Sequence, residues 1–135
     1  MPSRKHAREL ALQSLFGVEV GHRNPDDVVT EACGTTDSEQ RRFVKDLVDG
    51  TLDHAAESDA LLGPLLQGWT IERLPTIDRL LLRMSAFELA HRSTPAAVVI
   101  NEAVELAKKF STDESPRFVN GVLETYRKQI SAGAP

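Results

Sequence analysis

The sequence predicts an all-α fold of about seven helices, divided into two small helical subdomains that form one compact bundle. Apolar residues recur at three- and four-residue spacing almost throughout the chain, which is the period of a helix. The alternating pattern of strands joined by hairpin turns is missing. With 135 residues, of which 41% are hydrophobic and 27% charged, the chain is typical of one soluble domain with its own core.

The order of the elements follows from this spacing and from residues that begin or break helices. We expect helices near residues 3–20, 25–33, 38–57, 59–67, 75–92, 95–110 and 116–130. Asp37 with Gln40 has the form of a capping box before the third helix. Gly63–Pro64 is expected to break or bend the fourth helix.

The last three helices have the clearest signals. The fifth is apolar on nearly every side, which is typical of a helix at the centre of a bundle. Thr94–Pro95 and Ser115–Pro116 each place a capping residue and a first-turn proline before the two helices that follow.

The segment GWTIERLP, residues 68–75, is expected to connect the two subdomains. It places the N-terminal subdomain at about residues 1–68 and the C-terminal one at about residues 69–135 of a single domain. It also holds the single tryptophan, Trp69, which we expect to be packed because a large aromatic ring is seldom left on a free linker.

Positive charge gathers at the start of the first helix. Arg4, Lys5, His6 and Arg8 all precede the first acidic residue, although the whole chain carries a net charge of −4. Cations at a helix N-terminus face the positive end of the helix dipole, which costs about 0.3–1 kcal/mol each. A local rule that is broken in this way is a hint of function.

The helical period divides the first helix into two faces. The face of Ala7, Ala11 and Leu15 is expected to meet the core. Lys5, Arg8, Leu12 and Phe16 form a second strip, which offers cations for phosphates and a ring for base stacking, as single-stranded RNA recognition requires. The alternatives are a solvated basic terminus and a Phe16 that packs against a neighbouring helix.

Catalytic and cofactor motifs are missing from the sequence. We find no phosphate-binding glycine loop and no convincing set of catalytic or metal-binding residues, so we expect neither an enzyme nor a bound cofactor or metal. Cys33 has no nearby base in sequence and is interpreted as an inert thiol.

The same sequence features indicate where the protein acts. A lone cysteine suits a reducing compartment, and no apolar run approaches the length of about 20 residues that spans a membrane. The basic N-terminus lacks the apolar stretch of a signal peptide. We therefore expect a cytoplasmic protein without a membrane partner.

Four segments together carry a family pattern. They are RKHARELALQSLF (4–16), FVKDLVDG (43–50), INEAVELAKKF (100–110) and SPRFVNGVL (115–123). In this order and with this spacing they closely resemble the NusB family of transcription antitermination factors. The likeness fades only between Val20 and Ser38, so it covers most of the chain.

The resemblance implies a function as well as an all-α fold of two subdomains. NusB-like proteins are non-enzymatic factors that bind boxA RNA in ribosomal RNA transcripts together with the NusE ribosomal protein. The pair acts on the transcribing RNA polymerase complex, which then reads through terminators.

The resemblance also implies roles for residues at matching positions. Arg4, Lys5 and Arg8 match an arginine-rich start and would neutralise phosphates, while Phe16 and Phe118 match aromatic positions that contact RNA. Five further residues are assigned to the RNA or partner surface: His6, Leu12, Asp78, Arg83 and Glu114. For residues on the fifth helix, an internal ion pair is the alternative.

Two other functions are compatible with this sequence. NusB-like domains also serve as the RNA-binding module of ribosomal RNA cytosine methyltransferases, but the final SAGAP resembles a frayed end and favours a complete protein. A protein-interaction adaptor that binds no RNA is the second alternative. The apolar surface of the first helix suits a partner or a second copy in a homodimer.

Overall fold

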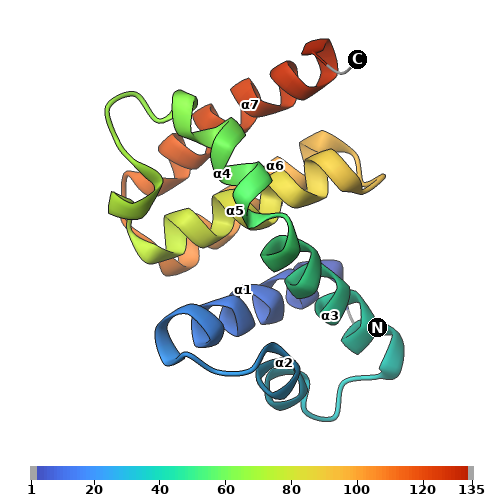
Figure 1. The fold of residues 1–135 in the computed structure, drawn as a ribbon. Coiled ribbons are helices and arrows are strands. Elements are labelled where there is room, and N and C mark those ends of the chain that lie inside the picture. The colour runs from blue at the N-terminus through green and yellow to red at the C-terminus, as the bar shows by residue number, and fades with distance from the viewer. Residues whose placement is uncertain (1–2, 134–135) are drawn as a thin grey trace. The chain divides into compact units, whose positions relative to one another are not determined.

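The computed structural model describes residues 3–133, and these residues form helices without a strand (Figure 1). The α-helices are α1 (Arg4–Gly21), α2 (Pro25–Cys33), α3 (Ser38–Asp53), α4 (Ala55–Leu62), α5 (Thr76–His91), α6 (Ala96–Phe110) and α7 (Ser115–Gly133). Two short 3-10 helices, η1 (Gly63–Leu65) and η2 (Ile71–Arg73), lie between α4 and α5. The all-α prediction is confirmed. The last two residues of the expected frayed end lie outside the described range.

The chain divides into two units, Met1–Asp53 and His54–Pro135, called unit 1 and unit 2 below. This division falls earlier than the expected boundary near residue 68. The reason is that α4 contacts α5 and α7, and therefore belongs with the C-terminal helices. Among the described residues, no helix is both long and apolar enough to cross a membrane.

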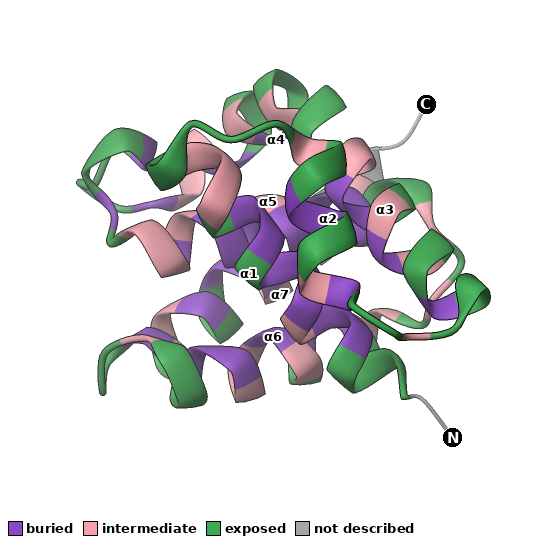
Figure 2. Cartoon of the chain, turned by 90° about the horizontal axis from the view of Figure 1, so that it is seen from below, coloured by how far each residue is buried: buried purple, intermediate pink, exposed green. Residues whose placement is uncertain are grey.

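Unit 1 is a three-helix unit in which α1, α2 and α3 all contact one another. The expected core face of α1 is buried at Ala7, Ala11 and Leu15. Figure 2 colours the buried residues of the chain purple. The α1–α2 approach is close: a Cβ added at Gly17 would lie 3.0 Å from Cγ1 of Val28, so a larger residue would press on α2.

Unit 2 is built around α5, which contacts α4, α6 and α7. Leu81, Leu82 and Met84 on this helix are almost completely buried, as predicted for a central helix. The connector before α5 differs from expectation, because Trp69 is 54% exposed. Its apolar anchor is instead Ile71, which is buried, so the tryptophan ring is not needed to hold the segment.

Proline marks the starts of α6 and α7, but not through the expected caps. Pro95 is itself the N-cap of α6 and makes no side-chain capping bond, so the capping role expected of Thr94 is wrong. Ser115 begins α7, but its hydroxyl donates to the Asp78 carboxylate. The start of α7 is thus tied to α5.

The reactivity of the Cys33 thiol gives a test of how α2 is packed. The residue is 3% exposed, and burial raises the pKa of its thiol, which nearby Arg41 offsets in part. Because the thiolate is the reactive form, we expect native Cys33 to react with a thiol reagent at least about tenfold more slowly than the unfolded chain at neutral pH. Stopped-flow labelling with and without denaturant measures this ratio, and equal rates would contradict the buried placement.

Candidate nucleic-acid interface

The first candidate surface is the N-terminal end of α1, formed by Arg4, Lys5 and His6 and called the cationic end below. Ser3 caps the helix, since its hydroxyl accepts a hydrogen bond from the His6 backbone N–H at 3.1 Å. This cap places the next three side chains in the first turn, where all three residues are exposed. The cationic end therefore presents two permanent positive charges and an imidazole to solvent.

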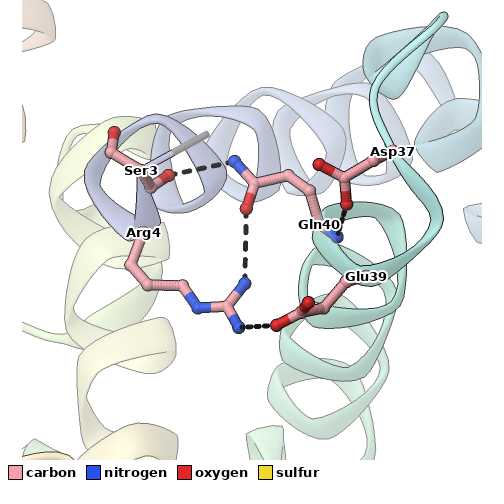
Figure 3. Close-up of polar contacts among 5 residues, drawn as sticks. All are labelled: Ser3, Arg4, Asp37, Glu39 and Gln40. Carbon is pink, nitrogen blue, oxygen red and sulfur yellow. Dashed lines mark hydrogen bonds and ion pairs between the residues drawn. The ribbon is translucent and has the colours of Figure 1, made fainter. Parts of the chain in front are cut away.

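Arg4 is oriented by contacts with α3 (Figure 3). Its guanidinium donates to Gln40 Oε1 and to Glu39 Oε1, each at 3.3 Å, and lies 4.2 Å from the centroid of the Phe43 ring. Gln40 in turn donates through Nε2 to the Ser3 carbonyl oxygen at 2.9 Å. The Arg4 side chain remains 45% exposed, so α3 fixes its direction without covering it.

Gln40 does not complete the capping box that the sequence suggested. Its backbone N–H donates to Asp37 Oδ1 at 2.9 Å, which is the expected half of the motif. Its side chain, however, bonds to Ser3 and Arg4 of α1 and is buried, so the second half of the motif is replaced by a link between α1 and α3.

The predicted strip on α1 is not a continuous surface. Lys5 and Phe16 are exposed at its ends, but Arg8 is 4% and Leu12 2% exposed. The physical reason is that α1 contacts both α2 and α3, so more than one of its faces is covered. The Arg8 guanidinium lies 5.5 Å from the centroid of the Phe43 ring. In this buried position it packs inside unit 1 and is not accessible to a phosphate.

The second candidate surface is a cleft of about 450 Å³ that lies within unit 2. Its lining residues are Trp69, Leu74, Pro75, Asp78, Thr112, Asp113, Glu114, Ser115 and Phe118. Three of the predicted site residues therefore come together here: Asp78 from α5, Glu114 from the turn before α7, and Phe118 from α7. The cleft combines two aromatic rings with exposed carboxylates, and none of the described residues that line it is a lysine or an arginine.

Asp78 lines this cleft as a buried carboxylate. It is 4% exposed, and its carboxylate accepts hydrogen bonds from Ser111 Oγ at 2.5 Å and from Ser115 Oγ at 2.9 Å. The Ser115 hydroxyl also accepts from the Thr112 backbone N–H. Asp78 therefore holds the turn that carries Glu114 into α7, and it is a positioning residue more than a contact surface.

Arg83 makes the internal ion pair that was the alternative for this position. Its Nε and Nη2 both lie 2.8 Å from the two carboxylate oxygens of Asp59 on α4, in a bidentate arrangement. The two side chains are only 19% and 26% exposed, so this pair joins α4 to α5 inside unit 2.

Several residues of the two candidate surfaces could not be predicted from the pattern of the first helix. Glu39, Gln40 and Phe43 reach the cationic end from another helix, and Trp69 was expected to be buried. The sequence signal for Gln40 existed in the capping pattern, but it pointed to the wrong partner. No pattern in the sequence pairs Phe43 with two arginines.

The chain is similar in sequence to known proteins over most of its length. Residues 5–128 match the NusB family. A transcription antitermination protein NusB from Symbiobacterium thermophilum is 42% identical over an alignment 143 positions long, which covers 98% of this chain and 94% of that protein. A second, from Solibacter usitatus, is 41% identical over 134 residues, with 96% and 92% covered. Both relatives are named as antitermination proteins and not as enzymes.

Solved structures show the same fold. T. maritima NusB superposes with a TM-score of 0.90 at 28% identity, covering 95% of this chain and 92% of that one. A crystal structure of antitermination factors NusB and NusE in complex with dsRNA gives a TM-score of 0.84 at 29% identity, covering 93% and 96%.

The role assigned to Asp78 leads to a stability prediction. Asp78→Ala leaves two hydroxyls of the turn without their acceptor, which is expected to lower the free energy of unfolding by about 1–3 kcal/mol. Urea unfolding followed by circular dichroism measures the change. Asp113→Ala, an exposed acid in the same turn, is the matched control and should stay within about 0.5 kcal/mol of the parent. Equal stability of the two variants would contradict the positioning role.

Proposed function

The chain belongs to the NusB family, as the sequence resemblance predicted, and from this membership we propose that it binds boxA RNA of ribosomal RNA transcripts together with NusE. In this proposal the pair acts in transcription antitermination on the transcribing RNA polymerase complex. Support comes from the names of the relatives and from the similar complex that contains NusB, NusE and dsRNA. The observation that carries the proposal is the exposed cationic end of a chain whose net charge is −4.

The cationic end is suited to exchange an internal partner for a phosphate. The Arg4–Glu39 ion pair is exposed, with 82% of the glutamate side chain in solvent. Such surface pairs contribute only about 0–1 kcal/mol, so a phosphate can replace Glu39 at small cost. The bond to Gln40 and the ring of Phe43 keep the guanidinium in place during the exchange. Lys5, exposed beside it, supplies a second charge.

Aromatic side chains provide the complementary contacts with bases. Phe16 on α1 is 40% exposed, and Phe118 lines the cleft of unit 2 with the exposed Trp69. Base–aromatic stacking needs an accessible ring face and tolerates any base. Each unit therefore brings its own stacking residue to the proposed RNA.

The carboxylates of the cleft favour a different kind of contact. Asp113 and Glu114 are exposed beside Phe118 and would repel a phosphate. Carboxylate oxygens accept hydrogen bonds from the amino groups of bases, which present donors on their edges. We therefore assign the phosphates to unit 1 and a base edge to the cleft.

The small number of exposed cations also explains a need for the partner. Arg8 is buried, so the cationic end offers fewer phosphate contacts than its sequence suggested. Fewer neutralised phosphates mean lower affinity and a shallower salt dependence. A second protein that holds the same strand raises the overall affinity without new contacts on this chain. We expect the complex with NusE to bind boxA RNA more tightly than the chain alone.

The first test removes the charges of the cationic end. In Arg4→Gln/Lys5→Gln, RNA affinity should fall at least about tenfold, and the slope of log K against log salt should decrease in magnitude by roughly 1.4. Fluorescence anisotropy of a labelled boxA RNA, beside a scrambled RNA and with or without NusE, gives both quantities.

The matched control is Lys108→Gln/Lys128→Gln, which changes the net charge equally at two exposed lysines of unit 2. It should bind RNA as the parent does. An equal loss in both double variants would reduce the effect to overall charge. Absence of binding to either RNA, with NusE or without it, would overturn the proposed function and favour an adaptor that binds only proteins.

The second test removes the stacking rings. Phe16→Ala and Phe118→Ala should each weaken RNA binding by about 1–3 kcal/mol, while the salt slope stays unchanged because no cation is lost. Phe110→Ala is the matched control, since this phenylalanine is 37% exposed at the end of α6 and belongs to neither surface. If all three variants bind alike, the rings do not stack on RNA.

A further inference from the structure

Two histidines and a glutamate meet at one place in unit 2. His54 is the N-cap of α4, Glu57 lies in the first turn of α4, and His91 is the last residue of α5. One ligand atom from each residue can be chosen so that all three lie within 4.8 Å of one another. No metal site is expected from the sequence, and the proposed RNA function does not use this cluster.

We propose that His54, Glu57 and His91 form a binding site for a divalent transition metal, with Zn²⁺ as the best match. Imidazole nitrogen is a preferred ligand of zinc, copper and nickel, whereas magnesium and calcium select oxygen. Three protein ligands of the His/His/Glu type are a common zinc set, and water then fills the fourth tetrahedral position.

The distances are close to those that a metal requires. His91 Nε2 lies 3.1 Å from Glu57 Oε2, and the His54 and His91 rings have centroids 4.1 Å apart. Two ligands of a tetrahedral Zn²⁺ lie about 3.4 Å from each other, given zinc–ligand distances of about 2.0–2.1 Å. The Glu57–His91 pair is already near this spacing. The two imidazole rings, whose planes are 41° apart, must turn so that one nitrogen of each faces the ion.

The surroundings hold the imidazoles without closing the site. The buried ring of Phe87, one turn before His91, lies 5.2 Å from the His54 ring and 5.5 Å from the His91 ring. Both histidine rings therefore pack against an apolar side chain. On the outside, the side chains of His91 and Glu57 are 34% and 49% exposed, so an ion can enter from solvent and the carboxylate can move toward it.

One nearby charge opposes the ion. The guanidinium of Arg92 lies 5.4 Å from the centroid of the Phe87 ring, on the residue that follows His91. Its repulsion is offset by the Glu57 carboxylate, which is a ligand itself and therefore closer to the ion. The net charge of the ligand set favours a cation.

A metal at this place would fasten the start of α4 to the end of α5. The ligands come from two helices, so the complete set exists in the folded unit and not in the unfolded chain. Binding to the folded state alone stabilises that state in proportion to the logarithm of the metal concentration. Metal binding would thus cross-link α4 and α5 and stabilise unit 2.

The test uses the full chain, freed of metal by a chelator, and ZnCl₂ as the probe. Calorimetric titration should give one Zn²⁺ per chain, and thermal unfolding should shift upward with ZnCl₂ but not with MgCl₂. His54→Ala and His91→Ala should each weaken binding at least about tenfold, because loss of an outer partner of a ligand already costs 10–100-fold. Co²⁺ in place of Zn²⁺ should show visible absorption of a tetrahedral site in the parent only.

His22→Asn is the matched control, because His22 is an exposed histidine of unit 1 in the left-handed region, which asparagine tolerates. It should bind as the parent does. Glu57→Gln preserves the shape of the site and serves if an alanine variant fails to fold by circular dichroism. Lack of Zn²⁺ binding by the parent, or equal binding by the parent and all ligand variants, would overturn the proposal.

Discussion

The polar side chains of α5 impose the constraint on which unit 2 depends. This helix contacts α4, α6 and α7, so a polar group buried on it must find a partner within the protein or remain unsatisfied at a cost of about 1–3 kcal/mol. Asp78 in its first turn bonds to the hydroxyls of Ser111 and of Ser115 at the start of α7, and Arg83 pairs with an aspartate of α4. His91, exposed at the end of the helix, bonds to Glu57. Each bond also fixes a neighbouring helix. The position of the cleft is a consequence of this requirement.

Unit 1 solves a different problem, which is the placement of cations at the positive end of a helix dipole. The sequence suggested that this cost was uncompensated and was therefore a sign of function. In the structure Arg4 is compensated by the Glu39 carboxylate, the Gln40 amide and the Phe43 ring. These contacts orient the guanidinium and still leave the Arg4 side chain 45% exposed. Lys5 remains the better example of the original argument, because it is exposed in the same turn.

The helices could be predicted because their period and their breaking residues are local properties of the chain. The site could be predicted only where local pattern determined exposure, as for Phe16. Arg8 was placed at the surface because helical period describes one helix, while burial depends on how many neighbours contact it. The prediction that Trp69 is packed was wrong for the opposite reason, since a large ring is buried only if a neighbour covers it. His54 and His91 lie on different helices, so their proximity is a property of packing alone.

The separation of charge between the two units bears on specificity. In the proposed function, phosphate contacts at the cationic end would position a strand but carry no information on its bases. The cleft of unit 2 has the groups that can read a base edge, because Asp113 and Glu114 are acceptors beside the Phe118 ring. Acceptors alone cannot distinguish all bases, since each base that carries an amino group can donate to them. A chain of this kind therefore has part of the information needed to select an RNA sequence. Under the proposed function, the remaining selectivity would come from the conformation of the RNA or from a protein bound beside it, and the partner would then have a role in specificity as well as in affinity.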